Sequence, residues 1–106
     1  MSIHRIFEKY KQTITLKHQS SYTDEYGYKR ITYTETSINV IIDFLSPERL
    51  RLMRDGKYSE EDVFFIAENT VDISLGDLIV WNDTTYKVVA KKDIRYGYIE
   101  YIAVKV

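Results

Sequence analysis

Residues 76–106, GDLIVWNDTTYKVVAKKDIRYGYIEYIAVKV, decide the fold class of this chain. They hold three runs rich in β-branched and aromatic residues, at 78–81, 85–90 and 98–106. Such runs between clusters of turn-forming residues are typical of β-strands. The pair Gly76-Asp77 is expected to open the first strand, and Asn82-Asp83-Thr84 to form a tight turn after it. The stretch therefore predicts three consecutive strands, and it contains no catalytic motif.

Two further strands are predicted near the N-terminus. Residues 13–19 alternate between polar and apolar side chains, which is typical of a half-buried strand. Residues 20–28 are polar, contain a glycine and are interpreted as a hairpin loop. Residues 30–44 then form a long returning strand, whose threonine-rich part at 32–37 is expected to extend past the sheet as an exposed arm.

Two short helices and one more strand complete the prediction. Within residues 1–12, apolar residues recur at helical spacing (Ile3, Ile6, Phe7 and Tyr10), with Ser2 as the N-cap. Residues 46–56 begin with Ser46-Pro47-Glu48, the chemistry of a helix start, and end with a glycine. Residues 63–67 are an apolar strand, and 71–75 are a helical turn or a short bridge.

The predicted fold is mainly β: a small antiparallel β-barrel of about six strands, since closure removes exposed sheet edges. The length of 106 residues indicates one domain, 1–106, with the short N-terminal helix at 1–12 and the inserted helix and loop at 46–56. A rhythm of alternating strands and helices is absent from the sequence, which argues against a parallel sheet. Trp81, the single tryptophan, is predicted to pack in or beside the core.

The composition excludes several classes of function. The chain has no cysteine, so it has no disulfide, thiolate metal site or thiol nucleophile. Its net charge of −1 argues against a general polyanion binder. No apolar run reaches the length of about 18 residues that a membrane span needs, and we expect no secretory signal. Ten tyrosines suit a sheet, and we expect most of them in the half-buried barrel wall, with interface contact as the alternative.

The residues with chemical potential do not form a recognisable site. His4 and His18 have no carboxylate or cysteine at metal-ligand spacing and are predicted to be exposed polar residues. The acidic cluster Glu60, Glu61 and Asp62 is interpreted as a solvated loop rather than a catalytic or cation site. The densest basic group is Arg49, Arg51, Arg54 and Lys57. We therefore predict no catalytic residue, no cofactor and no metal.

A second pattern leaves open the binding of single-stranded nucleic acid. Basic residues are interleaved with tyrosines at Tyr26, Tyr28, Lys29, Arg30 and Tyr33. Such a mixture suits a platform on which bases stack. The four glycines stand too far apart to form a phosphate-binding loop.

From Ser46 to Lys105 the chain resembles the head-tail joining proteins of tailed bacteriophages, in particular the small β-barrel stopper or head-closure group. The resemblance is carried by the order and spacing of short motifs: Ser46-Pro47-Glu48-Arg49-Leu50 with Gly56, the strand at 63–67, Leu75-Gly76-Asp77-Leu78-Ile79, Tyr86-Lys87-Val88-Val89, and Asp93-Ile94-Arg95-Tyr96-Gly97-Tyr98. It covers more than half of the chain. The first forty residues match in pattern only.

The resemblance implies a structural role in the virion. Proteins of this group self-associate into a ring below the portal and its adaptor, close the DNA channel after packaging and present a docking surface for tail proteins. Contact with packaged double-stranded DNA is expected, and a membrane is not. Of the two long polar segments, we prefer 54–62 over 20–30 as the one that faces the channel, and plain surface loops are the alternative for both. The alternatives are a barrel that binds single-stranded nucleic acid and an SH3-like module that docks peptides; an enzyme ranks below them.

Overall fold

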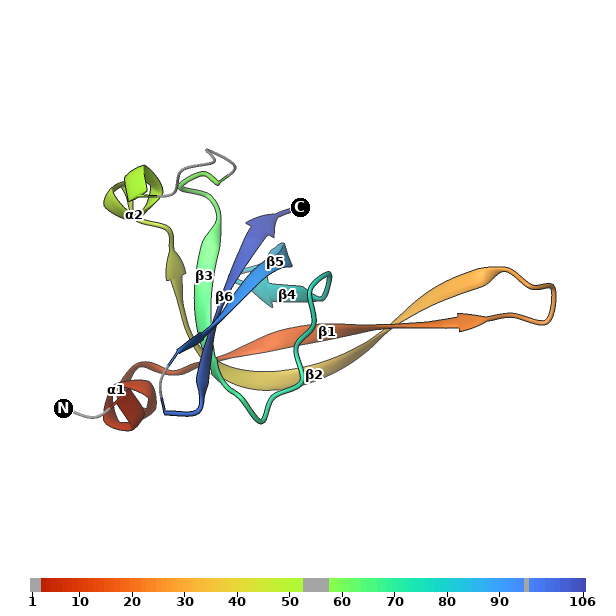
Figure 1. Cartoon of the computed structure of the whole chain (residues 1–106), viewed down its shortest axis with the longest axis horizontal. Helices are drawn as coiled ribbons and strands as arrows, with labels where there is room; N and C mark the ends of the chain where they lie inside the picture. The colour runs from red at the N-terminus through yellow and green to blue at the C-terminus, as the bar shows by residue number, and fades with distance from the viewer. Residues whose placement is uncertain (1–2, 53–57, 95) are drawn as a thin grey trace.

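The structure, a computed structural model, describes residues 3–52, 58–94 and 96–106. Its six strands form one closed antiparallel barrel in the order β1-β2-β3-β6-β5-β4 (Figure 1). The elements are α1 (Ile3–Tyr10), β1 (Gln12–Thr23), β2 (Lys29–Phe44), α2 (Pro47–Leu52), β3 (Val63–Glu68), β4 (Leu78–Trp81), β5 (Thr84–Ile94) and β6 (Tyr98–Lys105). The predicted fold class is confirmed, including the inserted helix between β2 and β3.

The turn between β4 and β5 lies where it was predicted but is one residue shorter, because Thr84 belongs to β5. Trp81 and Thr84 face each other across the ladder, so Asn82 and Asp83 alone make the connection. Both have positive φ, 51° and 60°. Two successive left-handed residues define the type I′ turn that matches the twist of a hairpin, and asparagine and aspartate tolerate this conformation better than most residues.

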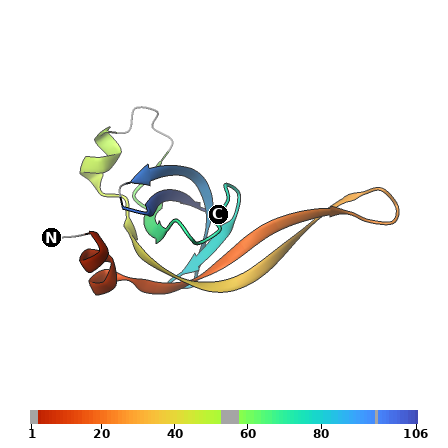
Figure 2. The ribbon, with the colours of Figure 1, turned by 60° about the horizontal axis from the view of Figure 1, so that its bottom comes forward.

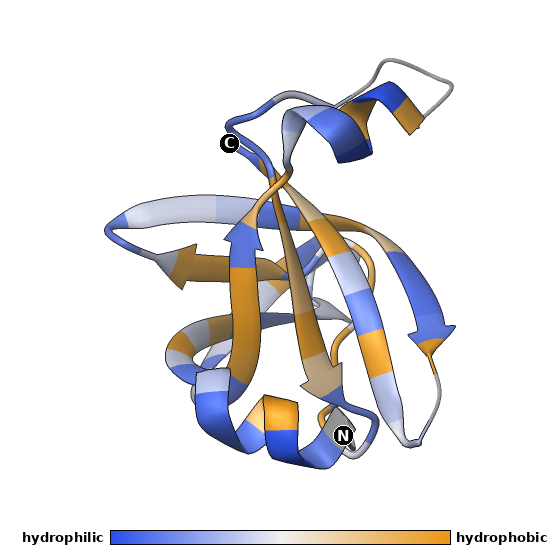
Figure 3. Ribbon diagram, turned by 90° about the vertical axis from the view of Figure 1, so that its left-hand side faces the viewer, coloured by the Kyte–Doolittle hydropathy of each residue, from blue (hydrophilic) through white to orange (hydrophobic). Residues whose placement is uncertain are grey.

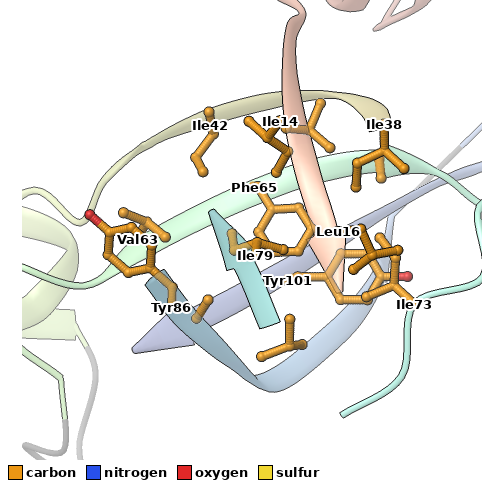
Figure 4. Packing of buried hydrophobic residues seen from close by; sticks show 14 residues of the cluster. Ile14, Leu16, Ile38, Ile42, Val63, Phe65, Ile73, Ile79, Tyr86 and Tyr101 are labelled. Carbon is orange, nitrogen blue, oxygen red and sulfur yellow. The ribbon is translucent and has the colours of Figure 1, made fainter. Parts of the chain in front are cut away.

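The core lies inside the barrel and is supplied by alternate residues of every strand (Figure 4). Phe65 of β3 and Tyr101 of β6 stack at its centre, with ring centroids 4.9 Å apart. Burial of the Tyr101 phenol raises its pKa. Trp81 is half-buried and packs against this cluster, which confirms its predicted place beside the core.

The β1–β2 hairpin extends far beyond the barrel (Figures 1 and 2). The two strands pair continuously from Gln12↔Val40 to Thr23↔Lys29. Their other edges are paired only near the barrel: β1 meets β4 over residues 15–17, and β2 meets β3 over residues 41–44. The predicted exposed arm is therefore confirmed. The predicted loop at 20–28 is too long, because the ladder continues to Thr23 and the connection is confined to residues 24–28.

The two helices lie at opposite ends of the barrel (Figure 3). Of the predicted apolar face of α1, Phe7 is buried against Tyr98, with ring centroids 5.1 Å apart, whereas Ile6 and Tyr10 are exposed. Ser46 caps α2 as predicted, since its Oγ accepts a hydrogen bond from the Arg49 N–H at 3.2 Å. The predicted N-cap Ser2 and the helix-ending Gly56 lie outside the described residues.

Residues 71–75 form a bridge without helical hydrogen bonding, so the second of the two alternatives is correct there. Within the described ranges, no helix combines the length and the apolar character needed to cross a membrane.

Candidate interaction surface

Among the described residues, the arm formed by β1 and β2 carries more exposed large apolar side chains than any other part of the structure. These side chains are Tyr22, Tyr26, Tyr28, Ile31 and Tyr33, each about half exposed or more. The expectation that most tyrosines belong to the barrel wall is wrong. Tyr86, Tyr98 and Tyr101 are buried there, but most of the others are exposed. Most of these exposed tyrosines lie on the arm, which extends beyond the barrel (Figure 1).

The tip of the arm is organised by Asp24. Its Oδ1 accepts the N–H groups of Tyr26 at 3.0 Å and Tyr28 at 2.9 Å, and its Oδ2 accepts Arg30 Nε at 2.9 Å. The Arg30 guanidinium, together with the two backbone donors, lowers the pKa of the Asp24 carboxyl. Gly27 supplies the left-handed backbone at the turn, with φ 83°. The tip is therefore a defined structure.

This geometry weakens the case for a nucleic-acid platform. Tyr26, Tyr28, Lys29, Arg30 and Tyr33 do lie on one arm, as the sequence pattern suggests. However, Arg30 is paired with Asp24, and Lys17 lies 3.6 Å from Glu35. The arm is thus close to electrically neutral, whereas a surface that follows a phosphate backbone needs a net positive charge.

The root of the arm is held by a buried carboxylate. Asp77 is fully buried, and its Oδ2 lies 2.7 Å from Nδ1 of His18, at the point where β1 leaves the barrel. The same side chain accepts the N–H groups of Gln19 at 2.9 Å and Ser74 at 2.8 Å. The prediction that His18 is a plain exposed residue is wrong, because its ring is partly buried in this network.

His4 also has a specific contact, since its Nδ1 lies 3.2 Å from the Tyr98 hydroxyl. The imidazole itself is on an exposed residue, as predicted. Among the described residues, no cluster of three or more histidines, aspartates or glutamates has the arrangement of a metal site.

The acidic cluster separates into two kinds of residue. Asp62 is buried and accepts the N–H groups of Ser59 at 2.9 Å and Lys105 at 3.0 Å, so it ties the loop before β3 to the end of β6. Glu60 and Glu61 are exposed, as expected for a solvated loop. They line a shallow groove beside Phe44 and Tyr86.

Of the basic group, only Arg49 and Arg51 can be described, because Arg54 and Lys57 lie outside the described residues. Arg49 forms an ion pair with Glu100 of β6, and its guanidinium lies 4.7 Å from the ring centre of Phe64. Arg51 donates to the carbonyl of Pro47 at 3.4 Å. Arg49 therefore fastens α2 to the barrel, a role that the sequence did not indicate because Glu100 is distant along the chain.

One end of the barrel carries a second aromatic group. The ring of the exposed Phe44 lies 5.1 Å from that of Trp81, which lies 6.5 Å from that of Tyr86. The Trp81 indole N–H donates to Gln12 Oε1 at 3.2 Å. This group lies beside the β4–β5 turn.

Comparison with known proteins shows a similarity of fold. No protein-family model matches the chain, and no curated protein matches it. Several solved structures are similar to the chain, including three that match it over most of their length. The solution structure of protein SF1141 from Shigella flexneri 2a has a TM-score of 0.73 at 12% identity, covering 88% of this chain and 89% of that chain.

Two further similar structures are a protein of a phage-like element and a chain from the virion of a gene transfer agent. The phage-like element PBSX protein xkdH from Bacillus subtilis has a TM-score of 0.58 at 16% identity, covering 90% of this chain and 93% of that chain. A chain from the virion of a native gene transfer agent particle has a TM-score of 0.58 at 12% identity, covering 90% of this chain and 94% of that chain. At these identities the likeness establishes the shared fold.

Proposed function

We propose that the chain is a structural, non-enzymatic protein of a tailed-phage-type virion, located at the neck between head and tail. There it assembles into a ring, closes the DNA channel after packaging and presents a docking surface for tail proteins. Its partners are other copies of itself, the portal or adaptor on the head side and tail proteins below.

The observation that carries this proposal is the near-complete overlap of the fold with a protein of a phage-like element and with a chain from a gene transfer agent virion. The overlap includes at least nine-tenths of this chain and of each of those chains. A partial overlap would indicate a common barrel embedded in different proteins. The motif order from Ser46 to Lys105 supports the same proposal independently.

The shape of the molecule agrees with a role in assembly. The principal extents are 54 × 31 × 26 Å, and the long axis follows the arm (Figure 1). An extended arm on a compact barrel allows contact with neighbours beyond the reach of the barrel itself. Our preferred channel-facing segment is 54–62, of which residues 54–57 lie outside the described residues. Its last residue, Asp62, accepts the Lys105 N–H at 3.0 Å and is thereby anchored to the end of β6.

The test is disruption of the gene in the phage or prophage that encodes it, followed by electron microscopy of the particles produced. Heads that have lost their DNA, found beside complete free tails, would support head closure. Complementation with the wild-type gene must restore joined particles. Intact, infectious particles from the disrupted gene would contradict the proposal and would direct attention to binding of single-stranded oligonucleotides, measured as a salt-dependent titration.

A further inference from the structure

The outer edge of β2 is a long, unpaired sheet edge. β2 meets β3 only from Ile41 onward, so residues 29–40 have no second strand partner within the described part of the chain. Residues 37–39 border α1, but 29–36 lie beyond it on the arm. This part contains no proline and no bulge, two devices by which proteins prevent pairing at an edge.

The hydrogen bond to Asp77 shows which residues point their backbone groups outward. The Gln19 N–H donates to Asp77, which lies on the side of β1 away from β2. Gln19 faces Tyr33 across the ladder, so Tyr33 also directs its N–H and C=O away from the partner strand. Because the direction of the backbone N–H and C=O groups alternates along a strand, every second residue of β2 directs them to the free edge. These residues are Lys29, Ile31, Tyr33 and Glu35.

The sequence of this edge is complementary to itself when a second copy runs antiparallel. With Thr32 opposite Thr32 of the other copy, Lys29 faces Glu35, and Ile31 faces Tyr33, each twice by symmetry. These pairs join opposite charges and apolar side chains, and the outward backbone groups of the two strands meet. Centring the pairing on Tyr33 instead would place Ile31 opposite Glu35.

We propose that free copies of this chain dimerise through the β2 edges at residues 29–35, forming a four-stranded antiparallel sheet in the order β1-β2-β2-β1. In this sheet Glu35 lies between Lys17 of its own copy and Lys29 of the other copy, so the charges alternate in sign. A two-stranded ribbon has marginal stability alone, whereas four strands stabilise one another.

The edge of β1 is a poorer partner for β2. Its Gln19 N–H is already bonded to Asp77, so its free part begins only at Ser20 and ends at Thr23. Pairing of β1 with β2 of a neighbour would therefore be short. The two-fold β2–β2 contact leaves the β1 edge and the barrel of each copy open for other partners.

This inference goes beyond the proposed virion function and is tested separately from it. The wild-type chain has no cysteine, so single cysteines report contacts without background. Thr32→Cys places two thiols at a symmetric, non-hydrogen-bonded pair, where Cα atoms lie about 4.5 Å apart, within disulfide range. Thr34→Cys is the matched control on the same face of the same strand, with its thiols about 13 Å apart across the two-fold axis.

The expected result is that mild oxidation of the purified Thr32→Cys chain gives a covalent dimer, whereas Thr34→Cys stays monomeric on a denaturing gel. If neither variant cross-links but a mixture of Ser20→Cys and Thr32→Cys chains does, the contact is the β1–β2 one and the proposal is wrong. Sedimentation of the wild-type chain as a monomer at the highest soluble concentration would also overturn it.

A charge exchange tests the register. Lys29→Glu and Glu35→Lys are each expected to weaken the dimer about tenfold, because each places like charges opposite one another at two symmetric positions. Mixing equal amounts of the two variants restores both opposite-charge pairs, so native mass spectrometry should show the heterodimer well above the half of all dimers that random pairing gives. A heterodimer that makes up only this random share would contradict the proposed register. Disruption of the gene, by contrast, tests the virion role whatever the result here.

Discussion

The carboxylate of Asp77 lies 2.7 Å from the imidazole of His18, and this contact joins the bridge before β4 to the strand that forms the arm. Asp77 is fully buried, and its side chain also accepts the N–H groups of Gln19 and Ser74. Its backbone carbonyl accepts the Val88 N–H at 2.8 Å. One residue therefore fixes three segments of the barrel to each other at the root of the arm.

Replacing Asp77 by alanine should destabilise the fold by about 2 kcal/mol, because it leaves the partly buried N–H groups of Gln19 and Ser74 without their acceptor. Asp77→Asn keeps one acceptor oxygen and should cost less, and His18→Ala should cost least, because the ring is partly exposed to water. Urea unfolding of the three variants measures these differences. A decrease in the free energy of unfolding below about 1 kcal/mol for Asp77→Ala would show that these hydrogen bonds contribute little to stability.

The strands were predictable because their determinants are local. The apolar alternation of β1 and the turn residues Asn82 and Asp83 act over a few positions, and the structure places both as expected. Ser46 at the start of α2 is a third local feature of this kind. Closure of the barrel then follows from the number of short strands that must bury one face each.

The contacts and exposure of the arm were less predictable because they depend on residues that are distant in sequence. His18 and Asp77 are separated by 59 positions, and nothing in either neighbourhood indicates the other. The exposure of Tyr22 and Tyr33 depends on where β4 and β3 stop pairing with the arm, which is a property of the whole barrel. Tyrosine has the same strand preference in a buried wall and on an open ribbon, so composition could not separate the two.

Trp81 provides a test of the aromatic group at the end of the barrel. Trp81→Ala removes contacts with Phe44 and Tyr86 and the hydrogen bond to Gln12, and should lower the free energy of unfolding by about 2 kcal/mol. A fully buried ring would cost about 3–5 kcal/mol, and this ring is half-buried. Trp81→Phe keeps most of the ring contact and serves as the control. Chemical denaturation followed by circular dichroism gives the values, and a loss as large as that of a fully buried ring would contradict the half-buried placement.

The tip of the arm should loosen in acid. The pKa of Asp24 is lowered in the folded state, first by Arg30 and then by the N–H of Tyr28, so its carboxylate stabilises the tip above the ordinary aspartate range. This contribution is lost as the pH falls from about 4 through the lower folded value. The amide resonances of Tyr26 and Tyr28 should move in that interval as their acceptor is protonated. In Asp24→Asn, which cannot titrate, the same resonances should stay constant; movement in both proteins would assign the effect to another group.

Arg49 should determine whether α2 stays on the barrel. Its guanidinium contacts Glu100 and the face of Phe64, and α2 buries no residue of its own among those described. Arg49→Ala should therefore release the helix and cost about 1 kcal/mol of global stability, since the contacts are partly exposed. Arg49→Lys keeps the charge but loses the planar group that stacks on the ring, and should rescue little. Hydrogen exchange of the Leu50 amide, which donates to Ser46 at 3.0 Å, reports the attachment directly. Slow exchange of this amide in Arg49→Ala would mean that another contact holds the helix in place.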